Sequence, residues 1–126
     1  MLTLGTVVLG AEDVRRAAGF WCEALGYVPR DGRVDEDWTV LLPADGRERG
    51  PGIALGASRT PVQEQPRVHL DLYARDAADQ AAEVERLIAL GAARVDWDLY
   101  PENPDFLVLA DTEGNRFCVI DASRGN

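Results

Sequence analysis

The sequence repeats itself at a spacing of 63 residues, and this feature limits the folds open to the chain more than any other. The segment "TVVLGAED" at 6–13 aligns with "HLDLYARD" at 69–76. Each segment reads as a strand ending in an aspartate that can cap a following helix. Both predicted helices close with "ALG", at 24–26 and at 89–91, where glycine suits a helix end. The two "ALG" motifs are 65 residues apart, against 63 for the segments before the helices, so the second helix should be about two residues longer.

Apolar residues alternate with polar ones in several further segments, which predicts β-strands. The predicted strands are 2–10, 37–42, 52–57, 67–73, 93–97, 106–110 and 116–120, with a weaker edge strand at 27–29. Between them, apolar residues at helical spacing follow the caps Asp13 and Asp76. The predicted buried stripes are Val14, Ala17, Trp21 and Leu25 in the first helix, and Ala77, Ala81, Val84 and Ile88 in the second.

The resulting order of elements is βαβββ, twice. One such module is too short to bury its own sheet face, so the two are expected to pack together. We therefore predict an α+β fold in a single domain over 1–126, with modules at approximately 1–60 and 66–122. A polar segment with two prolines, "RTPVQEQP" at 59–66, should join them.

Three segments carry a resemblance to a known family: "VVLGAEDVRRAAGFWCEALGY", "HLDLYARDAADQAAEVERLIALGA" and "LVLADTEGNRFCVID". The last is close to a "DPDGN" turn and final strand, and is the most specific of the three. Together they resemble the vicinal oxygen chelate superfamily of glyoxalase I, bleomycin-resistance proteins and extradiol dioxygenases, and most of all its glyoxalase-like bacterial proteins. The resemblance implies a mixed sheet curled into a U-shaped cleft. In metal-dependent members, the first and last strands of each half hold one divalent ion.

The resemblance also identifies the four positions that would hold this ion. His69, the only histidine, stands at one of them, and Thr6 stands at the matching position of the first half. Cys118 replaces the usual glutamate of the last strand, and its counterpart at Ala54 or Leu55 cannot bind a metal. A threonine hydroxyl is a poor ligand for transition metals, and catalytic sites generally use three protein ligands. We therefore expect no metal cofactor.

Should a divalent metal bind nonetheless, it would depend on His69 and Cys118, with Asp71 as the only third ligand at hand. His69 could also act as a general base tuned by Asp71, or be a catalytically idle hydrogen-bonding residue. Cys118 could be a nucleophile or a small buried apolar residue. Strand parity places a wider set on the faces expected to line the cleft: Thr6, Val8, His69, Asp71, Tyr73, Arg116, Cys118 and Ile120.

Two tryptophans, Trp38 and Trp97, occupy corresponding regions of the halves and are flanked by acidic residues. Aromatic side chains at the rim of a cleft can stack on a planar or cationic ligand. The resemblance includes bleomycin-resistance-like proteins that sequester cationic drugs in this way. Alternatively, both tryptophans belong to the core or to a dimer interface. We count them with Thr6, His69, Asp71 and Cys118 as candidate ligand-binding residues.

The charge balance narrows the possible partners. With 22 acidic and 13 basic residues the net charge is −9, which disfavours nucleic acid as a partner.

The first residues have neither the basic start of a signal peptide nor an apolar run of membrane length. Cys22 and Cys118 lie far apart in the sequence, as expected of reduced thiols in a cytoplasm. The basic residues are all arginine and alanine is abundant, which suggests a bacterial origin.

The sequence thus predicts a metal-independent glyoxalase-like protein whose cleft binds a small organic molecule, such as a drug or natural product. The alternative is a lyase, isomerase or dioxygenase that uses His69 in the same cleft as a base or a residual metal ligand. A purely structural or partner-binding module is a third possibility. The resemblance also implies a homodimer, with neither a membrane nor nucleic acid as partner.

Overall fold

A computed structural model describes residues 1–46 and 49–125 of the chain. It divides into two compact units, Met1–Pro61 and Val62–Asn126, which we call unit 1 and unit 2. The boundary between them falls inside the proline-containing segment 59–66.

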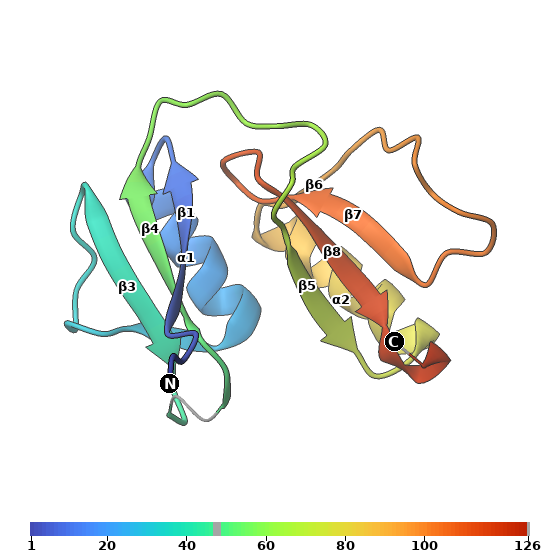
Figure 1. Ribbon diagram of the computed structural model, residues 1–126, viewed down its shortest axis with the longest axis horizontal. Coiled ribbons are helices and arrows are strands. Elements are labelled where there is room, and N and C mark those ends of the chain that lie inside the picture. Colours follow the sequence, from blue (N-terminus) through green and yellow to red (C-terminus); the bar gives the residue numbers. More distant parts are fainter. Residues whose placement is uncertain (47–48, 126) are drawn as a thin grey trace. The chain divides into compact units, whose positions relative to one another are not determined.

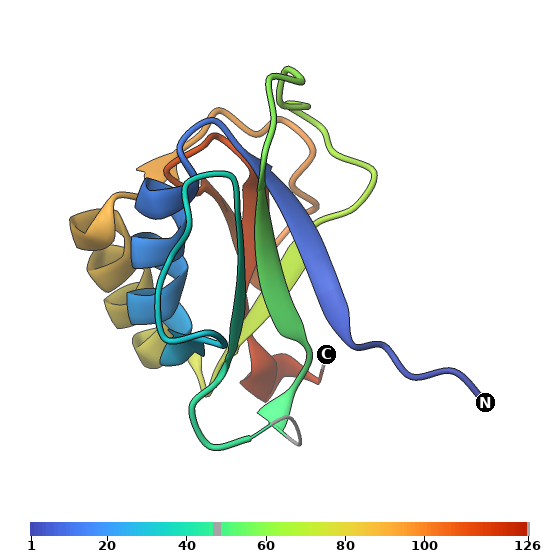
Figure 2. The same ribbon diagram turned by 90° about the vertical axis from the view of Figure 1, so that its left-hand side faces the viewer.

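Unit 1 is one βαβββ module (Figure 1). Its elements are β1 (Thr6–Ala11), α1 (Val14–Leu25), β2 (Tyr27–Pro29), β3 (Trp38–Pro43) and β4 (Gly52–Ala57). The described strands form a sheet in the order β1-β4-β3-β2, in which β1 and β4 are parallel and the other neighbours antiparallel. Helix α1 contacts β2, β3 and β4 and lies along one face of this sheet (Figure 2). The edge position predicted for 27–29 is confirmed.

Unit 2 repeats the same topology. Its elements are β5 (Leu70–Ala74), α2 (Ala77–Leu90), β6 (Ala93–Arg94), β7 (Phe106–Ala110), β8 (Arg116–Asp121) and a final 3-10 turn, η2 (Ala122–Arg124). The described strands are ordered β5-β8-β7-β6, again with the first pair parallel. The α+β fold built from tandem βαβββ modules is therefore confirmed.

Both helices begin at the predicted caps. The Asp13 carboxylate accepts a hydrogen bond from the Arg16 amide at 3.0 Å, and Asp76 accepts one from the Asp79 amide at 2.8 Å. Gly26 ends α1 at φ 69°, a left-handed conformation that glycine adopts without strain. Helix α1 has 12 residues and α2 has 14, so the two-residue difference read from the spacing is correct.

The buried stripe predicted for the second helix is partly wrong. Ala77 and Ala81 are exposed, and Val84 and Leu87 are the buried residues of α2. Gln80 explains the difference, because its amide donates to backbone carbonyls of the sheet, Asp105 O at 3.1 Å and Val119 O at 2.9 Å. A polar residue therefore takes the sheet-facing place one turn before Val84. In α1 the predicted residues are buried except Leu25, which is half-buried.

Three strands are shorter than predicted, and one of them is the strand predicted over 67–73, which spans Leu70–Ala74. The first strand of the chain begins at Thr6 instead of residue 2, and the strand expected over 93–97 ends after Arg94. Beyond that point Val95 and Trp97 pack against a buried cluster of Val108, Cys118 and Ile120, so the chain leaves the ladder of the sheet. In the described part of the chain, every helix is too short or too polar to cross a membrane.

Candidate functional site

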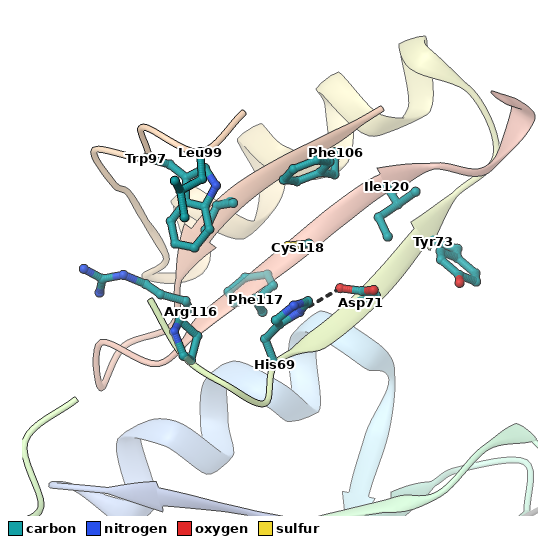
Figure 3. Close-up of a pocket in the computed structure, with 12 residues that line it drawn as sticks. His69, Asp71, Tyr73, Trp97, Leu99, Phe106, Arg116, Phe117, Cys118 and Ile120 are labelled. Atoms are coloured by element: carbon teal, nitrogen blue, oxygen red, sulfur yellow. Dashed lines mark ion pairs between the residues drawn. The ribbon is translucent and has the colours of Figure 1, made fainter. Parts of the chain in front are cut away.

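His69 and Asp71 lie at the start of β5. The sequence placed His69 in the middle of a strand, but the strand begins one residue later, at Leu70. Asp71 follows two residues after His69, and this spacing brings both side chains to the same face. The Nδ1 atom of His69 lies 2.9 Å from Oδ1 of Asp71, and both side chains are 42% exposed (Figure 3). A carboxylate accepts hydrogen bonds, so the neutral tautomer that suits this contact carries its hydrogen on Nδ1 and its lone pair on Nε2.

The neighbouring strand β8 adds Cys118 to this pair. Asp71 is the direct cross-strand partner of Cys118 in the parallel β5–β8 ladder. Three causes together raise the pKa of the Cys118 thiol to about 12: first burial, then the charge of Asp71 and a hydrogen bond between the thiol and Asp71. The thiol is therefore protonated at neutral pH, which favours the interpretation of Cys118 as a buried apolar residue over that of a nucleophile.

These three side chains form the group best suited to a metal among the described residues. One ligand atom each of His69, Asp71 and Cys118 lies within 4.8 Å of the others. The fit is incomplete, because an ion bound at about 2.0–2.3 Å draws its ligands closer than that limit and requires a deprotonated thiol. Asp71 is moreover already engaged by both of its neighbours.

The register of unit 1 settles which of its residues corresponds to Cys118. In the parallel β1–β4 ladder Val8 pairs with Ala54, as Asp71 pairs with Cys118 in unit 2. Ala54, and not Leu55, is therefore the counterpart. Its methyl group offers no ligand atom, and Thr6 offers only a hydroxyl.

A pocket of about 400 Å³ opens above His69 and Asp71, built from unit 2 alone. Its floor comes from β5 and β8, one side from β7, and the rest from the loop at 95–105 and from Pro66 and His69, which precede β5. The lining residues are Pro66, His69, Asp71, Tyr73, Trp97, Leu99, Phe106, Val108, Arg116, Phe117, Cys118 and Ile120. All the unit 2 residues placed on the cleft face by strand parity are among them.

The sequence reasoning missed several lining residues. Phe106 and Val108 could have been found, since they pair with Ile120 and Cys118 across the β7–β8 ladder and share their face. Leu99 and Pro66 lie outside the strands, where no periodicity carries a signal. Phe117 points by parity to the other face, but the pocket still reaches it.

The two candidate tryptophans have different surroundings. Trp97 lines the pocket of unit 2 and packs on its buried cluster. Trp38 is the first residue of β3 in unit 1, where it pairs with Gly56 and is 47% exposed. Its six-membered ring lies 3.3 Å from where a Gly56 side chain would begin, so this glycine makes room for the indole. Trp38 and Thr6 do not line the pocket of unit 2, and their role in ligand binding stays a prediction.

Two buried hydrogen-bond donors in the pocket wall stand out. Nε1 of Trp97 and Nε of Arg116 are buried, and neither finds a hydrogen-bond partner among the described residues. Arg116 is held in place at its other end, where Nη1 donates to the Gly114 carbonyl at 2.8 Å. Unpaired buried donors are rare in folded proteins, so both are sites where a ligand or water oxygen would be favourable.

The loop that closes the pocket is anchored by Tyr100. Tyr100 lies in this loop, and its hydroxyl accepts a hydrogen bond of 2.9 Å from the Val108 amide of β7. The Tyr100 ring packs on the ring of Phe106, with centroids 5.3 Å apart.

Replacing Tyr100 with phenylalanine should lower the free energy of unfolding by about 1–3 kcal/mol, because the ring stays while the Val108 amide loses its partner. Urea unfolding would measure this. Tyr73→Phe, which removes a hydroxyl from a residue 67% exposed, should change little, and equal losses in the two variants would contradict the anchoring role.

Comparisons with known proteins extend over nearly the whole chain. A family model described as a glyoxalase-like domain matches residues 6–120. A search of proteins with curated functions gives no match.

Similar solved structures agree with this assignment. A glyoxalase/bleomycin resistance protein/dioxygenase family enzyme from Burkholderia phytofirmans PsJN matches with a TM-score of 0.71 and 15% identity, covering 94% of this chain and 97% of that one. A glyoxalase-related enzyme from Fulvimarina pelagi gives 0.68 and 18%, covering 95% and 88%. A mutant of the fosfomycin resistance protein FosX from Listeria monocytogenes, complexed with manganese(II) and 1S,2S-dihydroxypropylphosphonic acid, gives 0.68 and 15%, covering 96% and 92%. At these identities the likeness establishes the fold alone.

Proposed function

Because the chain belongs to the glyoxalase-like domain family, we propose that it binds a small organic molecule in the pocket of unit 2, without a metal ion. The pocket itself carries this proposal. Its volume of about 400 Å³ lies within the usual range for small-molecule sites, and its lining is mostly apolar and aromatic with a few polar groups. Trp97, Phe106 and Tyr73 supply flat surfaces against which a ring system can pack.

Metal independence is supported by the donor groups. Thr6 and Ala54 stand at two of the four positions that the resemblance assigns to metal ligands. At a third, Cys118 replaces the usual glutamate, and its thiol would have to lose its proton to bind a metal. His69 is the one position of the four that keeps the family's usual ligand, and its Nδ1 lies 2.9 Å from Oδ1 of Asp71.

Ligand binding to metal-stripped protein tests the proposal. A screen of small molecules first identifies compounds that bind, and tryptophan fluorescence measures their affinity. We expect chelator-treated protein to bind these compounds as tightly as untreated protein.

Trp97→Ala should weaken binding about tenfold, because the ligand loses an aromatic contact surface worth about 1–1.5 kcal/mol. Stoichiometric zinc, nickel, iron or manganese in protein purified without an affinity tag, lost in His69→Ala, would refute metal independence.

The contact between His69 and Asp71 favours a second candidate, an enzyme of the lyase, isomerase or dioxygenase type. With Nδ1 held by the carboxylate, Nε2 is the nitrogen able to take a proton from a ligand in the pocket. For such an enzyme, His69→Ala should lower kcat by about 100-fold or more while ligand affinity is kept. If the original protein shows no turnover and His69→Ala lowers only the ligand affinity, the protein is a binding protein instead. The homodimer expected from the resemblance stays a prediction, which sedimentation equilibrium would test.

A further inference from the structure

The polar groups of the pocket indicate which kind of ligand it takes. One carboxylate, that of Asp71, lines the pocket, where it contacts the His69 imidazole and the Cys118 thiol. The groups left over are donors: Nε1 of Trp97 and Nε of Arg116, both buried and both without a partner in the described part of the chain. The pocket therefore needs acceptor atoms from its ligand more than it needs donors.

The two residues that carry these donors lie at the same end of the pocket. Figure 3 shows Trp97 and Arg116 at the end opposite Tyr73, with His69 and Asp71 between them. A buried donor without a partner is unfavourable, and an oxygen atom of a ligand bound at this end would supply the missing acceptor. One of the donors belongs to a guanidinium, and hydrogen bonds from charged donors to a carboxylate are stronger than those between neutral groups.

We propose that the ligand of this pocket is a planar apolar molecule that carries a carboxylate, with the carboxylate at the Trp97–Arg116 end. This rests on the proposed function, and it departs from the cationic drugs that the resemblance suggests. The net charge of −9 opposes the approach of an anion, but salt screens that long-range field beyond about 8 Å. At contact distance the charged group without a carboxylate partner is Arg116, among the described pocket residues.

Three naphthalene probes of the same shape separate the possibilities: 2-naphthoate, the neutral 2-naphthamide and the cationic 2-naphthylmethylammonium. Binding is followed in ¹H–¹⁵N spectra, in which the three tryptophans of the chain each give one indole N–H signal. Trp97→Phe identifies the signal of Trp97. We expect 2-naphthoate to shift this signal and to bind about tenfold or more tightly than the ammonium probe.

Matched variants locate the carboxylate. Trp97→Phe keeps an aromatic ring and removes the N–H, and Arg116→Met keeps the aliphatic stem and removes the charge. Each should weaken naphthoate binding about tenfold, whereas binding of the ammonium probe should not weaken and should strengthen in Arg116→Met, where a like charge is removed. Arg94→Met removes the same charge from an exposed residue outside the pocket, paired with Glu85 at 2.7 Å, and should change neither. Unchanged Trp21 and Trp38 indole signals would verify that each variant is folded.

The possible failures are distinguishable. Ammonium binding as tight as naphthoate binding, or naphthoate affinity unmoved by both pocket variants, would overturn the carboxylate assignment and leave the proposed function standing. Saturable binding by none of the three probes would count against the proposed function and the inference together.

Discussion

Replacing Leu109 with alanine should lower the free energy of unfolding by about 2–5 kcal/mol. Leu109 is fully buried in β7, where it pairs with the equally buried Phe117 of β8. Truncation leaves a cavity that the surrounding strands can close only in part, because protein interiors are packed densely. With a typical total stability of about 5–15 kcal/mol, such a loss is a large fraction of the whole.

Urea unfolding followed by far-UV circular dichroism measures this effect. The matched control is Leu99→Ala, which removes the same atoms from a residue 56% exposed in the loop at 95–105. Its stability should stay within about 0.5 kcal/mol of the original protein. If the two variants lost equal stability, β7 would not form part of the core of unit 2.

Cys118 should react with iodoacetamide about a thousandfold more slowly than an ordinary cysteine. Its pKa rises from the usual 9.0 to about 12, and only the thiolate attacks, so near neutral pH its reactive fraction falls by about three powers of ten. Burial of the side chain adds to the slowing. The experiment is best done in Cys22→Ser protein, which removes the other, half-buried thiol, with alkylation followed by mass spectrometry.

Asp71→Asn tests the cause of this protection. The substitution removes the charge that faces the thiol, so the pKa of Cys118 should fall and alkylation should speed up, although burial still keeps it slower than a free thiol. Asp96→Asn, which neutralises an exposed carboxylate in the loop, serves as the control. Rapid alkylation of Cys118 in Cys22→Ser protein that retains Asp71 would instead identify Cys118 as a nucleophile and favour an enzymatic role.

Much of the fold could be predicted because its signals are local. The caps Asp13 and Asp76, the glycine ends and the alternating strands all act within a few neighbouring residues. Repetition of this order revealed both modules. The errors arose where a tertiary contact outweighed the local pattern: Gln80 bonds to the sheet from the helix face assigned to alanines, and Val95 leaves its strand to pack on a buried cluster.

The candidate site divides in the same way. Strand parity alone placed His69, Asp71 and Cys118 on one face, and their chemistry already argued against the metal set implied by the resemblance. The sequence by itself therefore determined the order of elements, the family and the floor of the pocket.

Only the tertiary structure decided how the pocket is closed and what its polar groups lack. The loop at 95–105 has no periodicity, so nothing local indicates that Trp97 and Leu99 cover the sheet or that Tyr100 anchors the loop at Val108. Hydrogen bonding of a side chain depends on atoms far away in the sequence. The contact of Asp71 with His69 is visible only in the tertiary structure, where distant strands and the loop are brought together. The same holds for the buried N–H groups of Trp97 and Arg116, which have no partner among the described residues.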